Sequence, residues 1–212
     1  INGAYERTDN YRPVVSSERV YINPSFEWRP SDQTTITLEA DYLNEDRTPV
    51  TSTVNFANQG TDALYDMPHD KFLGFKNDNV NTELLTYSAR IKHYLTDKVS
   101  VRAAYYASSY QVDNTSTSLD TISGGYENSH RARSLSRSLR DDKNSTFQLD
   151  LVGQDVYTGS VKHTFQIGFD YRIANATTKN LNPLKKNKKG TMSSTPILID
   201  EIDVKGNAAA ID

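Results

Sequence analysis

The feature that most restricts the fold of this chain is an alternation of apolar and polar side chains with a period of two residues. It is clearest over residues 160–173, where every second position is apolar or aromatic. These positions are Val161, His163, Phe165, Ile167, Phe169, Tyr171 and Ile173. Successive side chains of a β-strand point to opposite faces, so the pattern predicts a strand with one apolar and one polar face.

The same alternation recurs along most of the chain. Further runs lie at 1–12, 21–29, 35–42, 85–95, 98–112 and 143–156. Together these runs predict about seven strands and no helix. Pro24 falls inside one run and cannot donate a ladder hydrogen bond, so we expect a β-bulge at that position.

Short and long connections alternate between these strands. The short ones, at 29–33, 95–98 and 157–160, are built from Pro, Asp, Gly and Ser, which favour tight turns. The long ones cover about 46–81, 112–142 and 175–212, where the alternation fades. In an antiparallel meander the long connections then share one end, together with the short connection near residues 13–17.

A transmembrane β-barrel accounts for this arrangement, because such barrels have short periplasmic turns and long extracellular loops. Their strands carry apolar side chains outward and polar side chains inward. This explains a charged fraction of 24% and a mean hydropathy of −0.67 in a membrane protein. The predicted fold is therefore all-β, an antiparallel up-and-down meander that forms part of a larger transmembrane barrel.

The composition argues against several other classes of protein. A net charge of −3 does not favour a nucleic-acid partner. The chain has no cysteine, and its four histidines are isolated, so no metal site is predicted. Glu39 and Asp41 share a strand face at a spacing that would suit a pair of catalytic carboxylates, but charged groups are common inside large barrels. We expect no enzymatic activity.

Five segments, 17–32, 38–49, 72–74, 133–142 and 159–172, are similar in order and sequence to one family. They resemble the barrel domain of TonB-dependent siderophore receptors of the ferrichrome and ferrioxamine type. The resemblance implies a large barrel in the outer membrane of a Gram-negative bacterium, plugged by an N-terminal domain. It also implies a ferric siderophore as the transported ligand, with no cofactor bound by the fragment.

Residues 1–212 are accordingly expected to be part of the barrel domain, with the plug domain absent. The implied partners are the ferric siderophore, outer-membrane lipid and lipopolysaccharide, and the TonB complex acting through the plug. The lysine cluster at 185–189 could bind lipopolysaccharide phosphates or could simply be a solvated loop.

Aromatic residues in the long connections are the candidate ligand contacts, because they offer apolar area at low entropic cost. These candidates are Tyr65, Phe72, Phe75, Tyr110 and Tyr126. Packing within the loops is the alternative explanation for each of them. Arg131 opens a basic stretch, 131–140, that could contact an anionic ligand or could belong to a strand extending above the membrane.

Two other functions remain open from the sequence alone. One is a passive porin-like or adhesin-like barrel, which would lack the plug. The other is a soluble secreted β-sandwich or carbohydrate-active module, in which the apolar faces would pack against each other.

Overall fold

The computed structural model describes residues 1–49, 70–120, 130–181 and 197–198. Its strands are β1 (Asn2–Asp9), β2 (Ser16–Asn23), β3 (Ser25–Ser31), β4 (Thr34–Arg47), β5 (Asn79–Thr96), β6 (Val99–Asp120), β7 (His130–Thr158), β8 (Val161–Leu181) and β9 (Ile197–Leu198). In these ranges no helix is long and apolar enough to cross a membrane.

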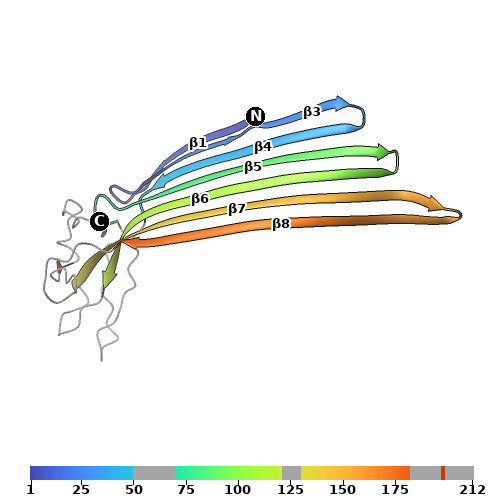
Figure 1. Ribbon diagram of the computed structural model, residues 1–212. Helices are drawn as coiled ribbons and strands as arrows, with labels where there is room; N and C mark the ends of the chain where they lie inside the picture. The colour runs from blue at the N-terminus through green and yellow to red at the C-terminus, as the bar shows by residue number, and fades with distance from the viewer. Residues whose placement is uncertain (50–69, 121–129, 182–196, 199–212) are drawn as a thin grey trace.

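All of these strands pair antiparallel in one curved layer (Figure 1). The order along the sheet is β1-β2-β4-β5-β6-β7-β8, and β3 and β9 pair with β4 and β7 off this path. The seven strands of the path match the number predicted from the alternation. The predicted all-β antiparallel meander is confirmed.

The turns at one end of the sheet are short. Two residues join β3 to β4, β5 to β6 and β7 to β8. Gly159, in the last of these turns, has a φ of +63°, a conformation that costs glycine little. Figure 1 shows the three turns together at one end of the sheet, and the connection between β1 and β2 at the opposite end, where β4 ends and β5 begins. This is the arrangement expected of an antiparallel meander, in which successive connections alternate between the two ends of the sheet.

The bulge predicted at Pro24 is wrong. β2 and β3 pair with β4 in one unbroken register across this residue. The side-chain amide of Asn23 donates to the carbonyl of Ala40 at 3.2 Å, close to where the missing N–H of Pro24 would point. The amide of Ala40 still donates to the carbonyl of Pro24 at 3.1 Å. The register shifts only further on, between Trp28 and Ser31.

The long connections are shorter than predicted, because the strands continue past the apolar alternation. β6 runs to Asp120 and β7 begins at His130, so most of the segment 112–142 is strand rather than loop. β8 runs to Leu181, inside the segment 175–212. The connection between β4 and β5 covers 48–78. Serine, threonine and charged residues occupy both faces of these strand ends, which removes the period-two signal.

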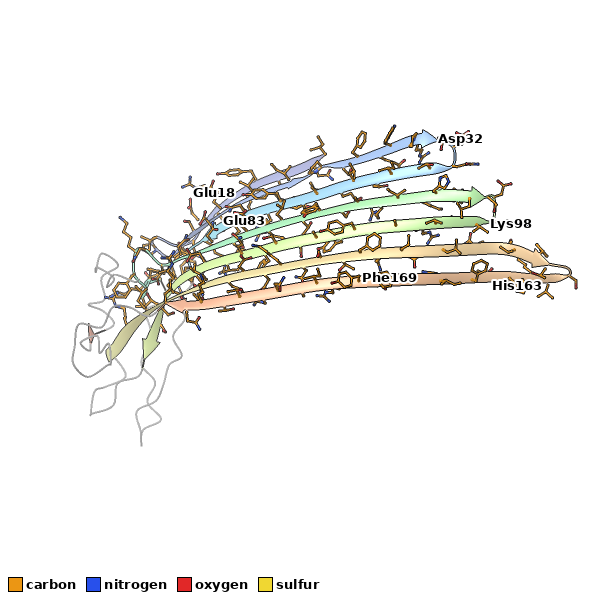
Figure 2. The ribbon with its side chains drawn as sticks, viewed as in Figure 1. Glu18, Asp32, Glu83, Lys98, His163 and Phe169 are labelled. Atoms are coloured by element: carbon orange, nitrogen blue, oxygen red, sulfur yellow. The ribbon has the colours of Figure 1, made fainter. Side chains whose placement is uncertain are left out.

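One face of the sheet is apolar and exposed. The strand register places Phe26, Leu38, Ala89, Tyr105, Phe147 and Tyr171 in one row across six neighbouring strands. Leu38 is 45% exposed and Tyr171 is 56% exposed. Figure 2 shows side chains standing along both sides of the single layer. Soluble monomers rarely expose so continuous an apolar surface, so this face requires an apolar environment.

Buried packing is concentrated at the end of the long connections. Phe72, Leu73 and Leu135 are each no more than 5% exposed. The first two belong to the segment 70–78, which precedes β5, and Leu135 lies on β7. The rest of the sheet has few fully buried side chains in its described part.

Candidate functional site

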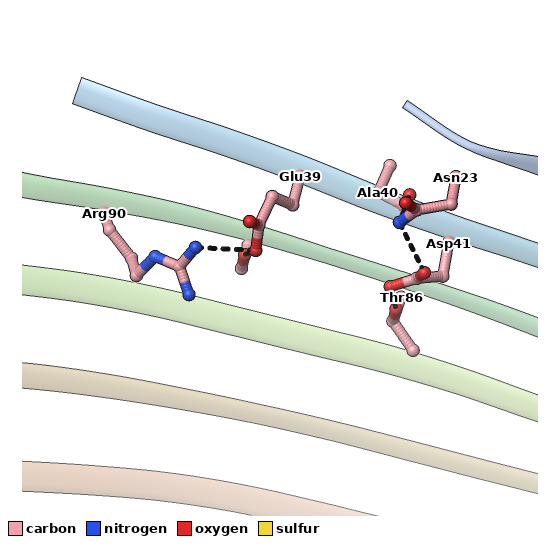
Figure 3. Close-up of polar contacts among 7 residues, drawn as sticks. Asn23, Glu39, Ala40, Asp41, Thr86 and Arg90 are labelled. Carbon is pink, nitrogen blue, oxygen red and sulfur yellow. Dashed lines mark hydrogen bonds and ion pairs between the residues drawn. The ribbon is translucent and has the colours of Figure 1, made fainter. Parts of the chain in front are cut away.

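The opposite face of the sheet is polar. Glu39 and Asp41 on β4 lie there with Thr86, Ser88 and Arg90 on β5 (Figure 3). The alternation places them here, because each is one residue away from an apolar position of the same strand. Arg90 Nη2 lies 2.7 Å from Glu39 Oε2, and both side chains are partly exposed.

Asp41 is held by three side-chain donors. Its Oδ1 accepts hydrogen bonds from Tyr21 Oη at 2.8 Å and Asn23 Nδ2 at 2.7 Å. Its Oδ2 accepts from Thr86 Oγ1 at 2.9 Å. Because Glu39 is paired with Arg90, both carboxylates already have partners in the sheet. This arrangement favours a structural role over the acid–base role considered from their spacing.

Two shallow hollows open on the polar face. One is lined by residues that include Glu39, Asp41, Thr86, Ser88, Arg90, Tyr106, Thr146 and Gln148. The other includes Thr35, Thr37, Lys92, Arg102 and Asp150. Both are open rather than enclosed, so the surface can hydrogen-bond water, a solute or another protein surface.

Nearer the long connections, the same face carries Tyr110 and Arg140. The guanidinium of Arg140 lies 6.0 Å from the centre of the Tyr110 ring, and its Nη2 lies 2.6 Å from Asp142 Oδ2. The Arg140 side chain is 56% exposed. Tyr110 was grouped with the loop aromatics although it falls in the predicted strand run 98–112, and it is half-buried within β6.

Phe72 and Phe75 occupy the segment 70–78. Phe72 is 3% exposed, which leaves its ring little surface for a ligand. Phe75 is half-buried, and the guanidinium of Arg133 lies 4.2 Å from the centre of its ring. Arg133 also donates to the carbonyl of Gly74 at 3.3 Å.

Asp78 is a buried residue that no sequence pattern identified. Its carboxylate accepts hydrogen bonds from the Thr117 amide at 3.1 Å and the Thr117 hydroxyl at 2.8 Å. Burial raises the pKa of Asp78, and these hydrogen bonds, with the charge of Arg133, oppose that rise. Its partner Thr117 was also missed, because it lies where the alternation of apolar and polar residues has faded.

Most of the remaining candidates lie where the structure gives no description. Tyr65, Tyr126 and the lysine cluster at 185–189 lie outside the described residues. Arg131 lies in β7, with its backbone in register with Ile197, as expected for a strand that continues beyond the apolar band. Among the described residues, no group of three or more acidic or histidine side chains could hold a metal ion.

Comparison of the sequence finds related receptors. No protein-family model matches the chain. The metal-pseudopaline receptor CntO of Pseudomonas aeruginosa, strain UCBPP-PA14, is 27% identical over 173 residues, which are 81% of this chain and 23% of the receptor. CntO of strain PAO1 is 25% identical over the same length. The chain thus spans about a quarter of these curated relatives.

Comparison of the structure finds barrels. The ferric-catecholate import receptor Fiu of E. coli K12, in its closed form, matches 98% of this chain and 30% of its own, with a TM-score of 0.76 and 20% identity. The ferripyoverdine receptor of the Pseudomonas aeruginosa outer membrane matches 99% of this chain and 27% of its own, with a TM-score of 0.77 and 14% identity. This chain has the fold of a segment of an outer-membrane receptor barrel.

The ferric preacinetobactin receptor BauA of Acinetobacter baumannii agrees with this result. It matches 99% of this chain and 30% of its own, with a TM-score of 0.70 and 17% identity. All of these relatives are receptors rather than enzymes. The ferrichrome and ferrioxamine subtype in the resemblance is not specified by any of them.

Proposed function

We propose that this chain is part of the barrel wall of an outer-membrane receptor that imports a metal–chelator complex. The observation that carries the proposal is the continuous apolar row from Phe26 to Tyr171, set back to back with a charged, hydrogen-bonded face. A single layer with one apolar and one wet face fits a wall between lipid and an aqueous lumen.

The names of the relatives support a metal chelate as the ligand. They bind metal-pseudopaline, ferric preacinetobactin and ferripyoverdine, all of which are metals carried by an organic chelator. We propose a ferric siderophore or a closely similar complex for this receptor. The metal would arrive within its chelator, so the barrel wall itself need supply no metal ligands.

On the polar face, Tyr110 and Arg140 are the described residues best placed to meet such a ligand. They lie toward the long connections, and an aromatic ring beside a guanidinium suits a bulky chelate with negative charge. Tyr65, Phe75, Tyr126 and Arg131 stay as further proposed contacts. We also propose that uptake is energised through a plug and the TonB complex, with lipopolysaccharide around the barrel.

Uptake by cells carrying the full-length receptor tests this proposal. Iron-55 bound to a panel of siderophores should accumulate in cells with the receptor and not in cells lacking it. Collapse of the proton gradient should stop accumulation but leave surface binding intact. Entry of unrelated small solutes, unaffected by loss of the gradient, would instead show the passive porin-like barrel.

A further inference from the structure

The segment 70–78 lies against the strands beside it rather than standing away from them. Asp78 is 3% exposed, and both of its carboxylate oxygens accept hydrogen bonds from Thr117 on β6. The Thr117 hydroxyl in turn accepts a hydrogen bond from the Phe75 amide at 3.2 Å. Arg133 on β7 contacts the same segment through Gly74 and the Phe75 ring.

The fit of this segment is close. A Cβ atom built on Gly74 would lie 2.3 Å from Asp78 Oδ2 and 2.7 Å from the Phe72 ring, so only glycine leaves room for this contact. Phe72 and Leu73, on the same segment, are almost fully buried. Buried apolar side chains and a buried, hydrogen-bonded carboxylate therefore both hold the nine residues of this segment in place.

The other end of the same connection is fastened to a different neighbour. The Thr48 amide donates to the Ser16 carbonyl at 2.9 Å, and its hydroxyl donates to the Val14 carbonyl at 3.0 Å. Val14 lies in the connection between β1 and β2, and Ser16 is the first residue of β2. The two described ends of the β4–β5 connection thus contact elements on opposite sides of β4 and β5.

We propose that Asp78 is a clasp that fixes the segment 70–78, which leads into β5, to its neighbours β6 and β7. Asp78 holds the segment 70–78 against β6, and this contact keeps the Phe75 ring under Arg133. A buried carboxylate is suited to this task, because it accepts hydrogen bonds from both the amide and the hydroxyl of Thr117, and its loss removes both. The inference concerns how the segment 70–78 is held and does not depend on the ligand.

Amide hydrogen exchange on the full-length receptor, folded in lipid vesicles, tests the clasp. In Asp78→Ala the Thr117 amide and the amides of 72–75 should exchange roughly tenfold faster or more, since both hydrogen bonds from Thr117 to the carboxylate are lost. The control is Asp70→Ala, which removes the same charge from an exposed position of the same segment. It should exchange as the native protein does.

A second variant keeps the test decisive if Asp78→Ala does not fold, which loss of protection in β4 would reveal. Thr117→Val keeps the shape of the side chain but removes the hydroxyl that accepts from Phe75. The Phe75 amide should then exchange faster, while β4 stays protected. Equal exchange in the segment 70–78 for the native protein, the folded clasp variants and Asp70→Ala would overturn the proposal.

Discussion

At the scale of single residues, Asn23 shows how a sheet accommodates a proline. Its side-chain amide donates both to the Ala40 carbonyl and to Asp41, so one amide group completes the ladder and joins the polar network. Pro24 is compatible with the strand because this neighbour supplies the donor. A sequence pattern shows the missing N–H of proline but not the side chain that replaces it.

We therefore expect Asn23→Ala to lower the free energy of unfolding by about 1–3 kcal/mol, because the Ala40 carbonyl and Asp41 Oδ1 each lose a hydrogen bond. The effect should be smaller in a Pro24→Ala background, where the backbone N–H is restored. Urea unfolding of the full-length receptor in vesicles measures this double-mutant cycle. Strictly additive effects would show that the amide does not replace the ladder donor.

Asp78 gives a prediction about pH, because burial raises its pKa above the ordinary value of 3.8. A group whose pKa is raised by folding contributes stability below its unfolded pKa and loses it as pH rises through the folded pKa. The segment 70–78 should thus be better protected near about pH 4 than at about pH 7.

Protection factors for the amides of 72–75, corrected for intrinsic exchange at each pH, measure this effect. Asp78→Asn carries no charge at either pH and should show little pH dependence. Protection that falls on acidification of the native protein would contradict the sign of the shift. The charge of Arg133 opposes the rise in the pKa of Asp78. The pH range over which protection changes therefore depends on Arg133.

At the scale of strands, the sequence predicted the parts that face an apolar environment and missed the parts that do not. The central portions of β4 to β8 alternate clearly, because one of their faces is apolar. Beyond Val112 in β6 and before Lys143 in β7, polar side chains occupy both faces, so no alternation remains. Backbone pairing continues there without a hydrophobic signal.

The candidate site was predictable to a similar degree. Phe75 and Tyr110 were proposed as ligand contacts because large aromatics are visible in a sequence, and their role stays a prediction. Arg140 pairs with Asp142 because both side chains lie on the same face of β7. The predicted strand began only at residue 143, so the sequence did not place these two residues on a common face. The clasp joins Asp78 to Thr117 across 39 positions, a contact that only the register of β5 and β6 brings together.

The connections predict which residues are reachable from outside the cell. This chain has no cysteine, so single substitutions in it introduce a unique thiol. Lys76→Cys, at the end with the long connections, should react with an impermeant thiol reagent on intact cells carrying an otherwise cysteine-free receptor. Asp97→Cys, in a short turn, should react only after lysis. Equal labelling of the two on intact cells would overturn the topology.

At the scale of the whole molecule, the sheet is incomplete by itself. β1 and β8 each leave one edge without a partner among the described strands, and unpaired edges favour association with further strands. In two structural relatives the matched region is about a third of the chain. Closure into a barrel would satisfy both edges and leave the apolar face toward lipid.

The central claim is that the apolar face meets lipid and the polar face meets water. Tryptophan fluorescence in the full-length receptor, with its other tryptophans replaced by phenylalanine, tests this claim on two adjacent residues of β4. In vesicles of brominated lipid, Leu38→Trp should be strongly quenched and Thr37→Trp should not. Quenching of neither residue, or of Thr37→Trp alone, in a properly folded receptor would contradict the membrane-wall assignment.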